Sequence, residues 1–125
     1  MDSDLKVLVV DDSKLMRNFA KNSLGALELK NVTEADDGVS ALSELKKEKF
    51  GLILSDLHMP RMNGLELLEA VRSDAGLRNI PFIIMTLDGK REVLLEAAKK
   101  GLNDFLMKPV TVSSLEKKLK KIFPH

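Results

Sequence analysis

Acidic, hydroxyl and lysine side chains stand at the ends of four short apolar runs, where they could together bind a metal ion and a phosphoryl group. Asp11 and Asp12 follow the first of these runs, and Asp56 follows another in the middle of the chain. Thr86 and Lys108 stand at the ends of two later runs. Carboxylates suit a hard divalent cation such as Mg²⁺, and hydroxyl and ammonium groups can bind phosphoryl oxygens. These five residues predict a magnesium-dependent site for phosphoryl chemistry.

Apolar runs and helical patterns alternate along the chain and predict the elements that carry these residues. The runs indicate strands at residues 5–10, 31–35, 51–55, 80–85 and 104–107. Between them, apolar residues recur at the three- and four-residue spacing of amphipathic helices. This alternation predicts an α/β fold of (βα)5 type, a doubly wound parallel five-stranded sheet with helices on both faces. The corresponding flavodoxin-like strand order is 2-1-3-4-5.

The predicted fold brings the five polar residues together. In an open parallel sheet, ligands bind beyond the carboxyl ends of the strands, where the winding order reverses. A polar residue after one strand is ordinary turn or helix-cap chemistry, but the same occurrence at four strand ends favours a site. A cation, Lys108 and Thr86 would cover the oxygens of a transferred phosphoryl group. Asp56 stands alone after the central strand and is the candidate nucleophile for an acyl phosphate.

Length and composition restrict the class of protein. The 125 residues are 44% hydrophobic and 31% charged, contain no cysteine and carry a formal net charge of +1. These values predict one soluble domain over residues 1–125, without disulfides or thiolate metal sites. The near-neutral charge argues against nucleic-acid binding. Because no apolar run approaches the length needed to cross a bilayer, we expect a cytoplasmic protein without membrane insertion.

The motifs resemble those of the response-regulator receiver domain, especially its stand-alone chemotaxis type, the CheY-like regulators. The similarity runs through essentially the whole chain, with the motifs in the family's order and spacing. It rests on Asp11-Asp12-Ser13 with Met16-Arg17, Asp56 with Met59-Pro60 and Asn63-Gly64, Thr86, and Lys108-Pro109.

The resemblance implies a role for each acidic residue. Asp56 would accept a phosphoryl group from a histidine kinase. Asp12 and Asp56 would ligate Mg²⁺ directly, Asp11 would act through water, and the main-chain carbonyl of His58 would complete the set. The protein would then be a signalling switch and not an enzyme, because it catalyses only its own phosphorylation and dephosphorylation.

The resemblance also implies a conformational switch. Thr86 and Lys108 would bind the phosphoryl group, and Phe105 occupies the position of the family's aromatic switch residue. The surface of the fourth helix, fifth strand and fifth helix would change shape and be read by a downstream protein, such as the flagellar motor switch. A phosphatase is a further partner of this kind, and a monomer is expected.

Three residues beside the predicted site distinguish this sequence within the family. Leu87 stands where the family usually has a small residue that leaves an approach to the acyl phosphate, and we hypothesise that it narrows this approach. His58 and Asp88 each stand two residues past a site residue and flank the same site. Their combined effect on the lifetime of the phosphate does not follow from the sequence.

Other functions are compatible with the same fold class. A receiver domain cut from a longer regulator with its own output module would have the same sequence features. A magnesium-dependent aspartyl-phosphate hydrolase of the haloacid dehalogenase class would resemble Asp-x-Asp after the first strand, whereas Asp11 and Asp12 are adjacent. A flavodoxin-like electron carrier would need a phosphate-binding loop and a Trp or Tyr, which this sequence lacks.

Overall fold

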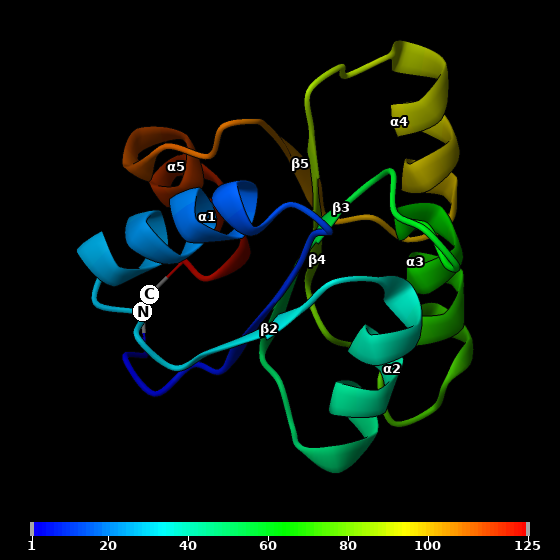
Figure 1. Ribbon diagram of the computed structural model, residues 1–125, viewed down its shortest axis with the longest axis horizontal. Coiled ribbons are helices and arrows are strands. Elements are labelled where there is room, and N and C mark those ends of the chain that lie inside the picture. Colours follow the sequence, from blue (N-terminus) through cyan, green and yellow to red (C-terminus); the bar gives the residue numbers. More distant parts are fainter. Residues whose placement is uncertain (1, 125) are drawn as a thin grey trace.

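The computed structural model describes residues 2–124, and over this range strands and helices alternate strictly (Figure 1). In chain order the elements are β1 Val7–Val10, α1 Lys14–Ala26, β2 Val32–Ala35, α2 Gly38–Lys47, β3 Leu52–Asp56, α3 Gly64–Ser73, β4 Phe82–Thr86, α4 Arg91–Lys99, β5 Asp104–Met107 and α5 Val112–Ile122. All neighbouring strands pair in parallel, in the order β2-β1-β3-β4-β5. The predicted fold class and strand order are therefore confirmed.

Helices cover both faces of the sheet. Helices α1 and α5 lie on one face, and α2, α3 and α4 lie on the other (Figure 1). Successive side chains of a strand point to opposite faces, so Val7 and Val9 pack with α1 and α5, whereas Leu8 and Val10 enter the other core. Burial on both faces explains why β1 is continuously apolar instead of alternating.

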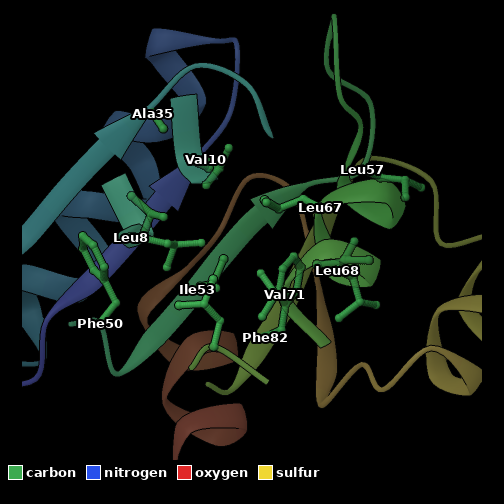
Figure 2. Close-up of a cluster of buried hydrophobic side chains, with 14 of the residues drawn as sticks. Leu8, Val10, Ala35, Phe50, Ile53, Leu57, Leu67, Leu68, Val71 and Phe82 are labelled. Carbon is green, nitrogen blue, oxygen red and sulfur yellow. The ribbon is translucent and has the colours of Figure 1, made fainter. Parts of the chain in front are cut away.

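The core between the sheet and α3 fixes the central strands. Figure 2 shows Ile53 of β3 and Phe82 of β4 facing Leu68 and Val71 of α3. All four side chains are fully buried. Burial of an apolar side chain of this size stabilises the fold by about 1.5–3 kcal/mol. Strands β3 and β4, whose ends carry two of the polar residues, are therefore fixed by their packing against α3.

The strand boundaries differ slightly from those predicted. Residues 5–6 and 80–81 lie before β1 and β4, and Pro81 has no N–H to donate to a neighbouring strand. Asp56 and Thr86 are the last residues of β3 and β4. Both side chains are thus placed by strand backbone and not by a loop. Within residues 2–124, no helix is both long and apolar enough to cross a membrane.

Strand β5 is joined to α5 through Asp104. Its carboxylate accepts a hydrogen bond from the backbone N–H of Phe105 at 2.8 Å and lies 3.0 Å from Lys118 Nζ. Burial acts to raise the pKa of Asp104, but the hydrogen bond from Lys118, aided by the charge of Lys121, leaves this pKa below its ordinary value. The ionised carboxylate therefore stabilises the junction of β5 with α5.

We expect Asp104→Asn to lower the free energy of unfolding at pH 7 by about 1 kcal/mol, because it removes this ion pair. A lowered folded-state pKa contributes stability above the unfolded-state pKa, about 3.9, and this contribution is lost as the pH falls through the folded-state value. The difference from the unmodified protein should therefore begin to shrink as the pH falls below about 4, and it should disappear only below the folded-state pKa of Asp104. Urea unfolding at several pH values measures it. Glu116→Gln, on the exposed side of α5, is the control and should change stability little. A difference in unfolding free energy for Asp104→Asn that stays constant with pH would contradict the prediction.

Candidate functional site

Three carboxylates gather at the carboxyl ends of β1 and β3. Asp11 and Asp12 follow β1 directly, and Asp56 ends β3, its neighbour in the sheet. One carboxylate oxygen from each residue lies within 4.8 Å of the others. Asp11 is fully buried, Asp56 is nearly so, and Asp12 is exposed. Like charges this close repel one another, so the cluster favours a cationic partner.

Lys108 supplies a positive charge to this cluster. Its Nζ lies 2.6 Å from Asp11 Oδ2 and 3.0 Å from Asp56 Oδ1. The residue follows β5, so its side chain reaches across the end of β4 to the central strands. Its side chain is only 6% exposed. Burial acts to lower the pKa of Lys108, but the two carboxylates outweigh burial and hold this pKa above its ordinary value.

Backbone groups orient the two buried carboxylates. The N–H of Leu57 donates to Asp56 Oδ1 at 2.8 Å, and the N–H of Ser13 donates to Asp11 Oδ1 at 2.9 Å. Among residues 2–124, no group donates a hydrogen bond of acceptable geometry to Asp11 Oδ2, although Lys108 Nζ lies close to it. A buried carboxylate oxygen that lacks a hydrogen bond, within a set of oxygen donors, fits a hard divalent cation.

Thr86 lies at the same edge but is turned toward the loop that follows it. Its hydroxyl donates to the carbonyl oxygen of Asp88 at 3.0 Å and accepts from the N–H of Asp88 at 3.1 Å. The backbone of Lys108 also reaches this residue, because its N–H donates to the carbonyl oxygen of Thr86 at 2.8 Å. The structure therefore places Thr86 beside Lys108 in the backbone, with its hydroxyl bound to the loop.

The remaining predicted residues surround this centre. Leu87, directly after Thr86, is 67% exposed, and His58 is exposed in the loop after β3. Asp88 contacts Thr86 through its backbone. Phe105 on β5 is partly buried, with Lys118 Nζ 5.2 Å from the centre of its ring.

Phe105 is also in reach of the loop that holds Thr86. A Cβ atom placed on Gly89 would lie 3.7 Å from Phe105 Cε2, so the loop backbone and the aromatic ring are neighbours. The peptide bond between Lys108 and Pro109 is cis. Gly89, three residues after Thr86, thus lies beside the ring of Phe105.

Arg17 is a site residue for which the sequence predicted no role. Its Nη1 donates to the carbonyl oxygen of Asp11 at 2.6 Å, and its Nε donates to Glu34 Oε1 on β2 at 2.8 Å. These contacts tie α1 and β2 to the end of β1. The signal in the sequence was its place in the Met16-Arg17 part of the family resemblance, one helical turn after Ser13, which caps α1.

Comparison with known proteins decides the family. The family described as Response regulator receiver domain matches residues 7–120. The chain is a response-regulator receiver domain. It is 42% identical over 123 residues to the chemotaxis protein CheY-3 of Vibrio cholerae, which covers 98% of this chain and 95% of that protein. The receiver domain described here is therefore homologous to CheY.

Solved structures support the same family. The structure of chemotaxis protein CheY4 from Vibrio cholerae matches this receiver domain with a TM-score of 0.88 and 32% identity, over 96% of this chain and 99% of that one. The receiver domain of a sensor histidine kinase from Pseudomonas aeruginosa, with a magnesium ion coordinated in its active-site cleft, matches with a TM-score of 0.84. At 24% identity, over 94% of this chain and 96% of that one, it shows the fold alone.

We expect Lys108→Met to lower the free energy of unfolding by about 3 kcal/mol without divalent cations, because it leaves two buried carboxylates without their counter-charge. Urea unfolding followed by circular dichroism measures this loss. Lys21→Met is the matched control, because Lys21 pairs with Glu34 on the surface at 3.1 Å and should contribute less than about 1 kcal/mol. Equal losses for the two variants would contradict a special role for the buried lysine.

Proposed function

We propose that this receiver domain is a Mg²⁺-dependent phosphoryl acceptor of a two-component system that serves chemotaxis, with Asp56 as the phosphoacceptor. The observation that carries the proposal is the buried contact of Lys108 Nζ with Asp11 and Asp56, beside Asp12, at the carboxyl edge of the sheet. The similarity to CheY-3 supports chemotaxis as the pathway. The donor is a histidine kinase, and the output is binding of a downstream protein.

The acidic cluster is the proposed Mg²⁺ site. Asp12 and Asp56 bind the ion directly, Asp11 binds it through water, and the main-chain carbonyl of His58 completes the oxygen set. When bound, the ion neutralises the carboxylates and the phosphoryl oxygens that approach them. The three carboxylates, whose oxygens lie within 4.8 Å of one another with one lysine as counter-charge, support this assignment.

Asp56 is well placed to act as a nucleophile. Leu57 N–H and Lys108 Nζ both contact Oδ1, so the geometry favours Oδ2 as the attacking oxygen. In the transfer, Oδ2 forms a bond to phosphorus, the bond from phosphorus to the histidine nitrogen breaks, and its electron pair stays with the imidazole. Lys108 then moves a short distance, from the carboxylate to a phosphoryl oxygen. Hydrolysis by water returns the carboxylate and releases phosphate.

The conformational response begins at Thr86 in this proposal. Its hydroxyl exchanges the backbone of Asp88 for a phosphoryl oxygen, which releases the loop that follows β4. Gly89 in that loop neighbours Phe105, so the change reaches β5. The surface of α4, β5 and α5 carries exposed Leu95 and Met107, and a downstream protein such as a flagellar motor component binds there. A phosphatase shortens the signal. The protein acts as a cytoplasmic, monomeric switch and does not turn over a free substrate.

The test of this function is formation of an acyl-phosphate analogue. With Mg²⁺ and beryllofluoride, we expect one adduct per chain, detected by ¹⁹F NMR, and none in Asp56→Asn. Asp36→Asn is the matched control, because Asp36 follows β2 at the same sheet edge outside the cluster. No adduct in the unmodified protein, or steady hydrolysis of simple phosphomonoesters, would argue against a phosphoryl-accepting switch.

A second expectation concerns Leu87. If its exposed side chain narrows the approach to Asp56, Leu87→Ala should accelerate phosphorylation by a small acyl phosphate by about threefold or more, a barrier change of about 0.7 kcal/mol. The rate of mass increase in intact-protein mass spectrometry measures this effect. Leu95→Ala removes an exposed leucine from α4 and serves as the control. Unchanged phosphorylation and hydrolysis rates in Leu87→Ala would rule out the narrowing.

A further inference from the structure

The loop between β3 and α3, residues 57–63, is held tightly at its base. The N–H of Gly64 donates to the carbonyl oxygen of Leu57 at 2.9 Å. A Cβ atom on Gly64 would lie only 2.4 Å from the backbone oxygen of Asp56, so this approach requires glycine. The backbone on both sides of the loop is therefore fixed next to Asp56.

The far end of the same loop is held by an ion pair. Arg61 Nε donates to Asp37 Oδ2 at 2.6 Å, and Nη2 of the guanidinium contacts the same oxygen. Asp37 lies just before α2, and its side chain is 4% exposed, whereas that of Arg61 is 61% exposed. Hydrogen bonding by Ser40 and the pairing with Arg61 hold the pKa of Asp37 below its ordinary value. The pair is therefore ionised at neutral pH and joins two loops 24 residues apart in the chain.

Asp37 uses its two oxygens for separate tasks. Oδ1 accepts from the backbone N–H of Ser40 at 2.8 Å and caps α2, while Oδ2 is left for Arg61. Arg61 itself has a φ of 65°, in the left-handed region that residues with a Cβ atom rarely adopt. Such a conformation persists only where the surroundings determine it. The cap and the ion pair thus share one buried carboxylate.

The next residue of the loop packs on the same helix end. The carbonyl oxygen of Met62 accepts from the N–H of Gly38, the first residue of α2, at 3.2 Å. The Met62 side chain fills the space beside Gly38, where an added Cβ atom would lie 2.6 Å from Met62 Cγ. Two successive loop residues, 61 and 62, are thus docked on the start of α2.

We propose that the pair of Arg61 and Asp37 is a positioning device for the His58 peptide group, whose carbonyl is the main-chain Mg²⁺ ligand in the function proposed above. In the sheet order, β2 and β3 flank β1, so the pair joins the loops that follow the two neighbours of the strand before Asp11 and Asp12. Residues 61 and 62 are held by the start of α2, and Leu57 is held by the backbone of Gly64. Only a short stretch around His58 lies between these two fixed points. The inference rests on the proposed function, because it assigns a role toward the same metal site.

If Arg61 acted only through its charge, replacing it would change the Mg²⁺ affinity in the opposite direction from a positioning role. Removing a cation from the loop that carries His58 should strengthen Mg²⁺ binding, because the surroundings of the site become more negative. A positioning role predicts weaker binding, because the carbonyl is no longer held in place. A purely structural role predicts lower stability with unchanged Mg²⁺ affinity. The sign of the change in affinity for Arg61→Gln therefore separates the three explanations.

The experiment is a calorimetric titration of Mg²⁺ into the unmodified protein, Arg61→Gln and Asp37→Asn. Asparagine caps helices as well as aspartate does, so Asp37→Asn removes the ion pair and keeps the cap of α2. We expect both variants to bind Mg²⁺ about tenfold more weakly. The double variant should be no weaker than either single one, because the two residues act as a unit. Arg61→Lys, which keeps the charge, should recover part of the affinity.

Lys100→Ala is the matched control, because it breaks an ion pair with Glu69 between α4 and α3, outside the loop. Its Mg²⁺ affinity should equal that of the unmodified protein, and thermal unfolding establishes that each variant is folded. Unchanged or tighter binding by Arg61→Gln and Asp37→Asn would overturn the positioning role alone. Absence of Mg²⁺ binding by the unmodified protein would instead overturn the proposed function, and this inference with it.

Discussion

The buried ammonium group of Lys108 is the constraint on which the site depends. Two carboxylates, from Asp11 and Asp56, lie within 3.0 Å of its Nζ, in a region where the lysine side chain is 6% exposed. Charges removed from water are costly unless they are paired, and here one cation faces two anions. The excess negative charge, increased by Asp12 at the rim, makes the site receptive to a further cation. The sheet order allows the lysine to reach these carboxylates, because the long side chain of Lys108, just after β5, crosses the end of β4 to reach β3.

This arrangement couples the acidic centre to the switch side of the molecule. The backbone N–H of Lys108 donates to Thr86, so the residue that pairs with Asp56 also holds the end of β4. A change in charge at Asp56 acts on Lys108 through its ammonium group, and Lys108 is bonded to Thr86 through its backbone. The hydroxyl of Thr86 is meanwhile bonded to Asp88, and in the proposed function it exchanges this partner for a phosphoryl oxygen. Two states with different hydrogen-bond partners are the kind of bistable element that a signalling domain needs.

The sequence predicted the parts of this structure that follow from periodicity and local chemistry. Continuous apolar runs indicated buried parallel strands, and the placement of Asp11, Asp56 and Lys108 at their ends indicated one shared edge. The direction of the Thr86 hydroxyl was not predictable, because it depends on hydrogen bonds with the backbone of Asp88 in the loop that follows β4. The ion pair of Arg61 with Asp37 was also missed, because nothing local in the sequence marks two residues that meet only after the sheet has formed.

The two sides of the site are built with different stiffness, and this difference follows from how the helices begin. Helices α2 and α3 each start with a capping box. The side chain of the N-cap residue accepts a hydrogen bond from the helix backbone, and a helix side chain accepts one from the N-cap backbone. Such a cap typically stabilises the helix by about 1 kcal/mol. Helix α4, in contrast, begins at Arg91, and its N-cap residue Lys90 makes no side-chain cap hydrogen bond. Its other end is held by Arg72, whose Nε donates to the carbonyl oxygen of Gly101 at 3.0 Å. The acidic cluster therefore lies between helices with side-chain caps, while α4, beside Thr86, is held at its start by the packing of Val93 and not by a side-chain cap. In the proposed function, a charge change at Asp56 would therefore meet less resistance on the α4 side, and the resulting movement would be directed toward α4.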